Sequence, residues 1–268
     1  MRRREKQARV RRWREWRRWG IAAGGLAILA LVIAGAVTLT MTLRKGPTGL
    51  RAVIVDQLAL TDENDDFVTR TKQELKDAGY HVDYVPTQRV TVDFYRALPG
   101  KGYKLIILRS HAAEQILKNK DTGAVTTIGD AALFTAEPYS PVEHVDDQYK
   151  AILGIGTIPQ APQLGQLFTI SPAFMESEAR GTFRGSTIVL MGCAGLKTET
   201  LARAFVARGA SEFISWDDSV TAEHTDKAAT ALLGHLLSDG LPGAEAVAQT
   251  MADVGPDPQF GAKLRAYP

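Results

Sequence analysis

Two short apolar runs constrain the fold of this chain more than any other feature. Residues 187–195 read T-I-V-L-M-G-C-A-G, and residues 103–109 read Y-K-L-I-I-L-R. Such runs are too short for a free helix, and an unbroken apolar run suits a strand buried on both faces. We therefore expect both to be central strands of a sheet that helices cover on each side.

The flanking sequence alternates between strand-type and helix-type segments. Residues 51–56 and 81–85 predict strands, and residues 67–78 predict an amphipathic helix that ends at Gly79. This alternation is typical of a doubly wound α/β fold, with a mostly parallel sheet and helices on both faces. We assign residues 51–268 to this domain. Further helices are expected at 91–98, 171–178, 198–208, 221–238 and 242–253, and a further strand at 212–216.

Residues 113–185 interrupt this alternation and predict a loop-rich insertion. Within them, residues 122–127 and 131–136 predict a hairpin that turns at Gly129 and Asp130. Prolines then stand among scattered glycines, at Pro138, Pro141, Pro159 and Pro162. Long loops in a compact domain are commonly functional, so the insertion is a candidate for a role in binding.

The first 43 residues predict a membrane anchor. Residues 1–20 hold nine Arg and one Lys against two Glu, a net charge of +8, so the rest of this +2 chain carries −6. Residues 21–43 contain no charged side chain. As a helix they would span about 34 Å, enough to cross a bilayer.

The charge asymmetry also predicts the orientation of this anchor. Positively charged flanks stay in the cytoplasm, so we expect residues 1–20 inside, residues 21–43 in the lipid bilayer of the cell membrane, and the linker at 44–50 with the domain outside. A cleavable signal peptide is the alternative. Its apolar core would be unusually long, and no clear small-x-small site precedes Arg44.

A reactive side chain follows each of the two central strands. His111 comes after residues 103–109, and Cys193, the only cysteine, comes after the run at 188–191. Catalytic groups collect at the carboxyl ends of parallel strands, and an imidazole beside a thiol can take its proton. The alternative is that both residues are structural, since a lone cysteine usually packs and a strand-end histidine often only forms hydrogen bonds.

Several function classes lack their motifs. No Gly-rich phosphate loop follows the strand at 51–56, and no aromatic and basic residues interleave after the membrane segment, so we expect no nucleotide and no nucleic acid. His144, His224 and His235 lack the paired spacing of a zinc site. Residues 62–66 predict a helix N-cap; calcium is the alternative, although the Gly and closing Glu of an EF-hand loop are missing. We expect neither a metal nor a cofactor.

The chain resembles the caspase-haemoglobinase fold, clan CD of the cysteine peptidases, and most of all its prokaryotic caspase-like and CHAT-type members. The resemblance rests on L-I-I-L-R-S-H-A at 105–112 and on T-I-V-L-M-G-C-A-G at 187–195. Residues 201–216, followed by a long helix, are similar to the part of CHAT domains after the cysteine. The match covers roughly residues 50–255.

This resemblance implies a cysteine peptidase dyad. His111 would act as general acid and base, and Cys193 would attack a peptide carbonyl to form a thioester. The backbone N–H groups of Ala112 and Cys193 would hold the oxyanion. The chain departs from the clan in two respects, because Ala112 stands where Gly is usual and the interval of 82 residues between His111 and Cys193 is long for a CHAT domain.

Neighbouring strand ends would then set the substrate preference. Asp56 ends the strand at 51–56, while Trp216 ends the strand at 212–216 and is followed by Asp217 and Asp218. Carboxylates there would favour a basic P1 residue of a peptide or protein substrate. The alternative is that Asp217 and Asp218 only shape a turn and cap the next helix.

Two other functions share this fold. One is a non-catalytic caspase-like module that is tethered to the membrane and binds a peptide or protein. The other is an α/β sensor domain in which His111 and Cys193 are both structural. Alkylation of Cys193 by iodoacetamide across pH distinguishes a reactive thiol from a packed one.

Overall fold

A six-stranded sheet forms the centre of the domain, in the order β10-β9-β8-β3-β1-β2. The computed structural model describes residues 49–118 and 125–268 of the protein. Neighbouring strands pair in parallel, except that β10 is antiparallel to β9. This arrangement confirms an α/β fold with a mostly parallel sheet. Its strands are β1 (Arg51–Asp56), β2 (His81–Pro86), β3 (Leu105–Arg109), β8 (Thr187–Leu190), β9 (Glu212–Trp216) and β10 (Leu264–Tyr267).

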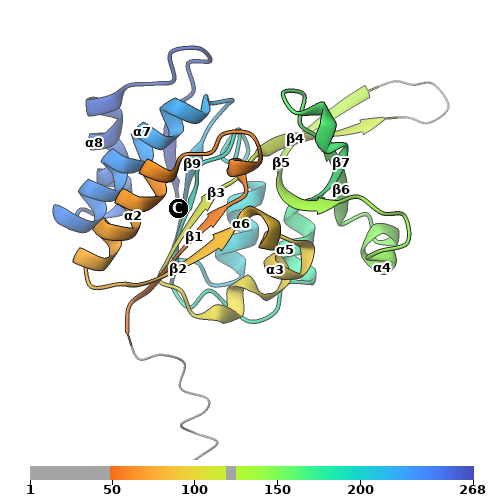
Figure 1. Ribbon diagram of the computed structural model, residues 1–268, viewed down its shortest axis with the longest axis horizontal. Helices are drawn as coiled ribbons and strands as arrows, with labels where there is room; N and C mark the ends of the chain where they lie inside the picture. The colour runs from red at the N-terminus through yellow and green to blue at the C-terminus, as the bar shows by residue number, and fades with distance from the viewer. Residues whose placement is uncertain (1–48, 119–124) are drawn as a thin grey trace, which may run out of the picture. The chain divides into compact units, whose positions relative to one another are not determined.

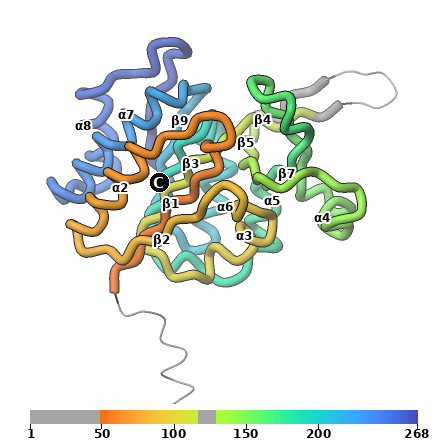
Figure 2. The backbone as a smooth tube through the Cα atoms, in the orientation of Figure 1, coloured from red at the N-terminus to blue at the C-terminus, as the bar shows by residue number. Residues whose placement is uncertain are grey.

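Helices cover both faces of this sheet (Figure 1, Figure 2). One face carries α2 (Asp65–Asp77), α7 (Ala222–Leu233) and α8 (Gly243–Val254); the other carries α3 (Val92–Ala97), α5 (Pro172–Ser177) and α6 (Thr200–Ala207). Asn64, Thr91, Ser171 and Thr221 cap α2, α3, α5 and α7 with side-chain oxygens. The shorter helical segments are α4 (Val145–Tyr149), η1 (Leu58–Leu60), η2 (Thr87–Arg89), η3 (Leu98–Lys101), η4 (Pro162–Leu164) and the π-helical η5 (Gly234–Ser238).

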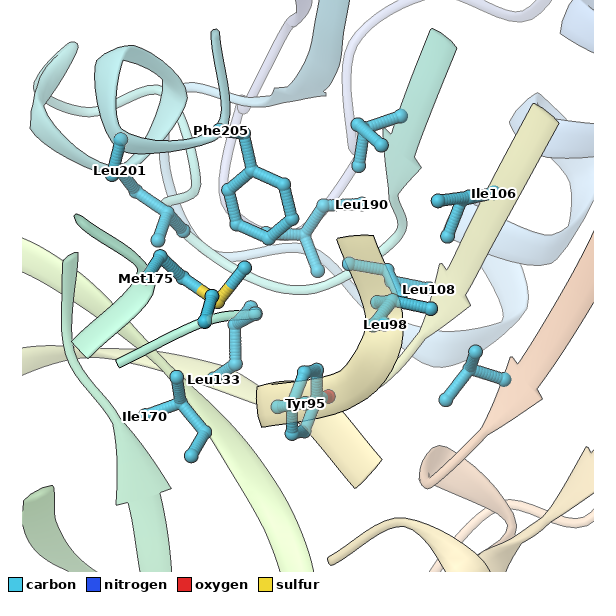
Figure 3. Close-up of a cluster of buried hydrophobic side chains, with 14 of the residues drawn as sticks. Tyr95, Leu98, Ile106, Leu108, Leu133, Ile170, Met175, Leu190, Leu201 and Phe205 are labelled. Atoms are coloured by element: carbon cyan, nitrogen blue, oxygen red, sulfur yellow. The ribbon is translucent and has the colours of Figure 1, made fainter. Parts of the chain in front are cut away.

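The unbroken apolar runs of the central strands are explained by burial on both faces. In β3, Ile106 and Leu108 join the cluster under α3, α5 and α6, which Figure 3 shows. Leu105 and Ile107 point the other way and pack under α2, α7 and α8. Successive side chains of a strand point to opposite faces, so a strand covered on both sides needs apolar residues at every position.

The insertion is a second sheet, and two predictions about it were wrong. Four antiparallel strands pair in the order β4-β5-β7-β6, where a loop-rich segment was expected. Gly129 and Asp130 lie inside β5 instead of at a turn, beside a register shift between Glu114 and Ile116 of β4. The strands are β4 (Ala112–Lys118), β5 (Val125–Pro138), β6 (Leu153–Thr157) and β7 (Gln166–Ile170).

Burial overrides the local turn signals in this second sheet. Leu133 of β5 and Phe168 and Ile170 of β7 belong to the same buried cluster as α5 and α6 (Figure 3). Packing on a shared core therefore continues β5 past Gly129, whose φ of 83° lies at the irregular stretch of the pairing with β4. The strand persists because β propensity depends on tertiary neighbours more than on the residue itself.

The sequence analysis missed one strand, and its predictions for residues 1–43 concern residues that the structure does not describe. The short strand β10 was not expected; it covers the edge of β9. The basic tail at 1–20 and the apolar span at 21–43 lie outside the described residues. Within the described ranges, no helix combines the length and the apolar character needed to cross a membrane.

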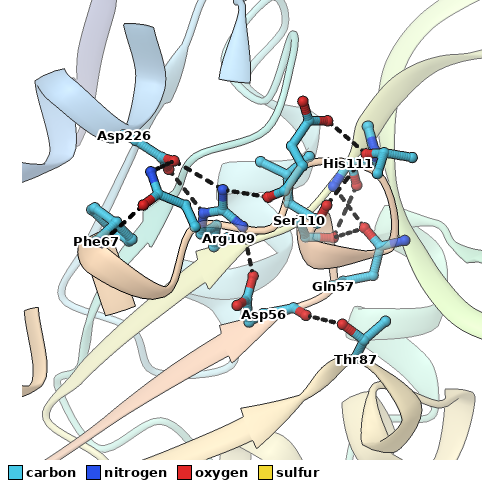
Figure 4. Close-up of polar contacts among 12 residues, drawn as sticks. Asp56, Gln57, Phe67, Thr87, Arg109, Ser110, His111 and Asp226 are labelled. Atoms are coloured by element: carbon cyan, nitrogen blue, oxygen red, sulfur yellow. Dashed lines mark hydrogen bonds and ion pairs between the residues drawn. The ribbon is translucent and has the colours of Figure 1, made fainter. Parts of the chain in front are cut away.

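A fully buried arginine joins four segments at the carboxyl edge of the main sheet (Figure 4). Arg109, the last residue of β3, is 0 % exposed. Its Nη1 donates to Asp56 Oδ1 of β1 at 2.8 Å, and its Nε and Nη2 donate to the two carboxylate oxygens of Asp226 in α7, each at 2.8 Å. Nη2 also donates to the carbonyl oxygen of Asp62 at 2.7 Å. The guanidinium thereby uses four of its five N–H donors and fixes the loop between β1 and α2.

Replacing Asp226 with Ala should destabilise the domain strongly. The variant removes two of the four hydrogen bonds of Arg109 and leaves a buried cation half-compensated, a change that typically costs about 3–5 kcal/mol. Denaturant unfolding measures the free energy directly. The matched control is Asp66→Ala, because the Asp66 carboxylate is highly exposed and lies 3.8 Å from the exposed Arg70. Equal losses in the two variants would contradict a central role for Arg109.

Candidate active site

The two strands that precede His111 and Cys193 are parallel neighbours, as the sequence predicted. β3 pairs with β8 in the register Leu105↔Thr187 to Leu108↔Leu190. Beyond the last pair, Met191 N–H donates to the carbonyl oxygen of Leu108 at 2.9 Å. The segments that follow the two strands therefore leave the sheet side by side at its carboxyl edge.

Glycine and a left-handed alanine shape the segment around Cys193. A Cβ at Gly192 would collide with the carbonyl oxygen of Ser110, so only glycine lets the His111 and Cys193 segments approach this closely. Ala194 has a φ of 57°, which is unusual for a residue other than glycine. Its N–H donates to the carbonyl oxygen of Asp218 at 3.0 Å, and that bond helps to hold the strained turn.

Cys193 presents a protonated thiol in this state. Its Sγ donates to the carbonyl oxygen of Val220 at 3.6 Å and accepts from the N–H of Val220 at 3.4 Å. Burial raises the pKa of the Cys193 thiol; the Val220 backbone bond opposes this, and the carboxylates of Asp257 and Asp218 add to it. The resting thiol therefore needs a base before it can act as a nucleophile.

His111 is held by the loop between β1 and α2. Its Nε2 lies 2.7 Å from Thr61 Oγ1, and its backbone N–H donates to Gln57 Oε1 at 2.8 Å. The ring also packs edge-on against Phe134, with centroids 6.1 Å apart. Burial lowers the pKa of His111, with the charge of Asp62 opposing and that of Arg109 adding. The imidazole is therefore neutral at neutral pH and able to accept a proton.

His111 and Cys193 line one cavity of about 550 Å³. Among the described residues, no hydrogen bond joins the two side chains; the ring contacts Thr61 and the thiol contacts Val220. Ala112 and Cys193, whose N–H groups are the predicted oxyanion donors, both line this cavity. The apolar wall is formed by Leu58, Phe134, Ile158, Pro159, Val220 and Phe260, and polar groups come from Thr157, Gln160, Ser219, Thr221 and Gln259.

Asp56 and Trp216 do not contribute to this cavity, so the prediction that they bind substrate was wrong. Each is 1 % exposed. The Asp56 carboxylate accepts from Arg109 and, at 3.0 Å, from the hydroxyl of Tyr84. Trp216 Nε1 donates to Thr225 Oγ1 at 2.9 Å. Both side chains point into the domain, where buried polar groups form hydrogen bonds with them.

Asp217 and Asp218 also lie outside the cavity, against the prediction. They line a separate polar hollow of about 620 Å³ beside β10. Asp217 accepts from the N–H of Lys263 and from Arg265 Nε, both at 2.7 Å, and so fastens β10 to β9. Asp218 accepts from the N–H of Ser219 at 2.8 Å and shapes the turn, whereas Thr221 is the residue that caps α7.

The loop between β1 and α2 supplies the site residues that the sequence analysis missed. Gln57, Thr61 and Asp62 stand there; Gln57 and Thr61 contact His111, and Asp62 lines the cavity. Their position just after a strand, at the same carboxyl edge, was a usable signal. Asn64 caps α2 by accepting from the N–H of Phe67 at 3.0 Å, which is the role predicted for residues 62–66.

The chain matches no protein-family model and no curated protein. Among the described residues, no three His, Cys, Asp or Glu side chains are grouped where they could hold a metal ion. The chemical interpretation of the site therefore depends on the geometry of a thiol and an imidazole in one cavity.

Proposed function

We propose that this chain is a membrane-anchored cysteine endopeptidase of caspase-like type, with Cys193 as the nucleophile and His111 as the general acid and base. The observation that carries the proposal is the placement of both side chains in the wall of one cavity, at the ends of two neighbouring parallel strands. A protonated thiol and a neutral imidazole form a complete pair for acyl transfer, because one holds the proton that the other can accept.

The first half of the reaction would form an acyl-enzyme. As a peptide carbonyl enters the cavity, His111 takes the thiol proton while the sulfur lone pair attacks the carbonyl carbon. The carbonyl π electrons move onto oxygen, and the backbone N–H groups of Ala112 and Cys193 stabilise that charge. The intermediate then collapses, the C–N bond breaks, and His111 gives its proton to the leaving amine.

The second half would release the product. His111 takes a proton from a water molecule, whose oxygen attacks the thioester carbon of the acyl-enzyme. The C–S bond breaks and the sulfur regains its proton from His111, which restores the resting pair. The same imidazole serves as base and then acid in each half, so the reaction needs no second titrating group.

A basic P1 residue fits the charge of this cavity. Of the described residues that line it, Asp62 and Glu114 carry carboxylates. Glu114 is paired with Lys197, whereas Asp62 is exposed and its carboxylate accepts from the hydroxyl of Thr61. We therefore assign the preference for a basic P1 residue to Asp62, in place of Asp56, Asp217 and Asp218.

The non-catalytic binding module is the second candidate, and one observation favours it. The pKa of the Cys193 thiol is raised, whereas a free nucleophile benefits from a lowered one. In that case the cavity would bind a peptide without cleaving it.

Replacing either member of the dyad should abolish peptide hydrolysis while the fold persists. Cys193→Ala and His111→Ala should each lower kcat/KM at least about a thousandfold, measured with a library of fluorogenic peptides on the full-length chain. His235→Ala is the matched control, because His235 contacts Asp239 and Asp253 and does not line the cavity. Peptide binding that survives in the wild type without any hydrolysis would support the binding module instead.

The same library should show a preference for Arg or Lys at P1. Asp62→Asn keeps the size of the side chain and removes its charge, so basic substrates should lose more kcat/KM than apolar ones, by about tenfold. Glu114→Gln is the control, since Lys197 already neutralises Glu114. A wild-type preference for Asp at P1 would overturn this specificity.

Protease added to intact cells should remove the domain at 51–268 and spare a tag placed on residues 1–20. The reason is the charge-free stretch at 21–43 with a net charge of +8 on its N-terminal side. Permeabilised cells, in which the tag also becomes accessible, are the control. Full protection of the domain in intact cells would contradict the proposed topology.

A further inference from the structure

A threonine hydroxyl forms a hydrogen bond with Nε2 of the His111 ring. Thr61 follows η1 in the loop between β1 and α2, and its Oγ1 lies 2.7 Å from His111 Nε2. The pair is 50 residues apart in the sequence and partly buried. Nothing in the dyad described above assigns a role to this contact.

Counting protons shows which partner donates. A hydroxyl has one hydrogen and two lone pairs. Thr61 Oγ1 has two oxygen neighbours that can only accept, Asp62 Oδ2 at 2.7 Å and the carbonyl oxygen of Leu58 at 3.3 Å. A bond to the Asp62 carboxylate is charge-assisted and takes the single hydrogen. Thr61 can then meet His111 Nε2 only by accepting, so Nε2 carries the ring proton.

We infer that Thr61 is a positioning residue that holds His111 in its Nε2–H tautomer and leaves Nδ1 as the nitrogen that accepts the Cys193 proton. This inference rests on the proposed function. When Nδ1 is protonated, Nε2–H goes on donating to Thr61, whose own hydrogen points at the Asp62 carboxylate. These two hydrogen bonds, from His111 to Thr61 and from Thr61 to Asp62, end at a negative charge and so stabilise the imidazolium. No proton passes to Asp62.

The loop that carries Thr61 is fixed at both ends. The carbonyl oxygen of Asp62 accepts from Arg109 Nη2 at 2.7 Å, and Gln57 Oε1 accepts from the N–H of His111 at 2.8 Å (Figure 4). Gln57 Nε2 in turn donates to the carbonyl oxygen of Thr135 at 3.2 Å. Thr61 therefore contacts the ring from a loop that is anchored to the same edge of the sheet, which keeps the contact in place during the reaction.

The experiment compares Thr61→Val, which keeps the shape and removes the hydroxyl, with Thr61→Ser, which keeps the hydroxyl. Thr69→Val on the exposed surface of α2 is the matched control. We expect Thr61→Val to lower kcat about 10- to 100-fold with little change in KM, and Thr61→Ser to stay within about threefold of the wild type. The acidic limb of kcat/KM against pH should move to lower pH in Thr61→Val, because the imidazolium loses its support.

A second measurement needs no activity. The ¹⁵N shifts of the ring nitrogens report the tautomer, and His111→Ala identifies the His111 signals among five histidines. The wild type should show protonated Nε2, and Thr61→Val should show a mixture. An unchanged tautomer and pH profile in Thr61→Val would overturn the role of Thr61. A wild type without any hydrolysis would overturn the proposed peptidase, while the ring shifts would still decide on Thr61.

Discussion

The buried guanidinium of Arg109 is the interaction on which the arrangement at the carboxyl edge of the sheet depends. A cation that is 0 % exposed is tolerated only when it is paired and hydrogen-bonded. Asp56 and Asp226 supply the opposite charges, and the carbonyl oxygen of Asp62 accepts a further bond. These two carboxylates come from β1 and α7, so the ion pairs tie the central strands to the helical layer. Because Asp56 pairs with Arg109, its carboxylate faces inward and cannot reach a substrate.

The geometry of the candidate site follows from that anchor in three short steps. Arg109 holds the carbonyl oxygen of Asp62, the loop around Asp62 carries Thr61, and Thr61 contacts the ring of His111. On the neighbouring strand, Gly192 permits a close approach that any Cβ would block. Backbone contacts thus place the two reactive segments, and the side chains need no direct bond to each other at rest.

Burial shifts the pKa values of Cys193 and His111 in opposite directions and leaves both side chains uncharged. A partly apolar cavity raises the pKa of the Cys193 thiol and lowers the pKa of His111, since both charged forms lose hydration. The resting pair is therefore neutral, unlike a thiolate–imidazolium pair. In the proposed mechanism, charge would develop only when a substrate carbonyl accepts the nucleophile, where the backbone donors and the Thr61–Asp62 contacts would stabilise it.

Local sequence was sufficient for the central strands, the capped helices and the two residues proposed to react. The reason is that burial periodicity, N-caps and strand ends are properties of a few consecutive residues, as in residues 51–56 and in the cap of α2 by Asn64. The same local view failed for β5, where turn-type residues at Gly129 and Asp130 lie within a strand because Leu133 packs into the shared core.

Only the tertiary structure decided which polar side chains reach the cavity. Asp56 and Asp62 lie six positions apart, and both contact Arg109, 53 and 47 residues away. Asp56 gives Arg109 its carboxylate and is buried, whereas Asp62 gives only its carbonyl oxygen and lines the cavity. The contact of Thr61 with His111 spans 50 residues and has no sequence period. The sequence alone therefore determined the fold class and the candidate thiol and imidazole, while long-range hydrogen bonds and ion pairs decided the remaining members of the site.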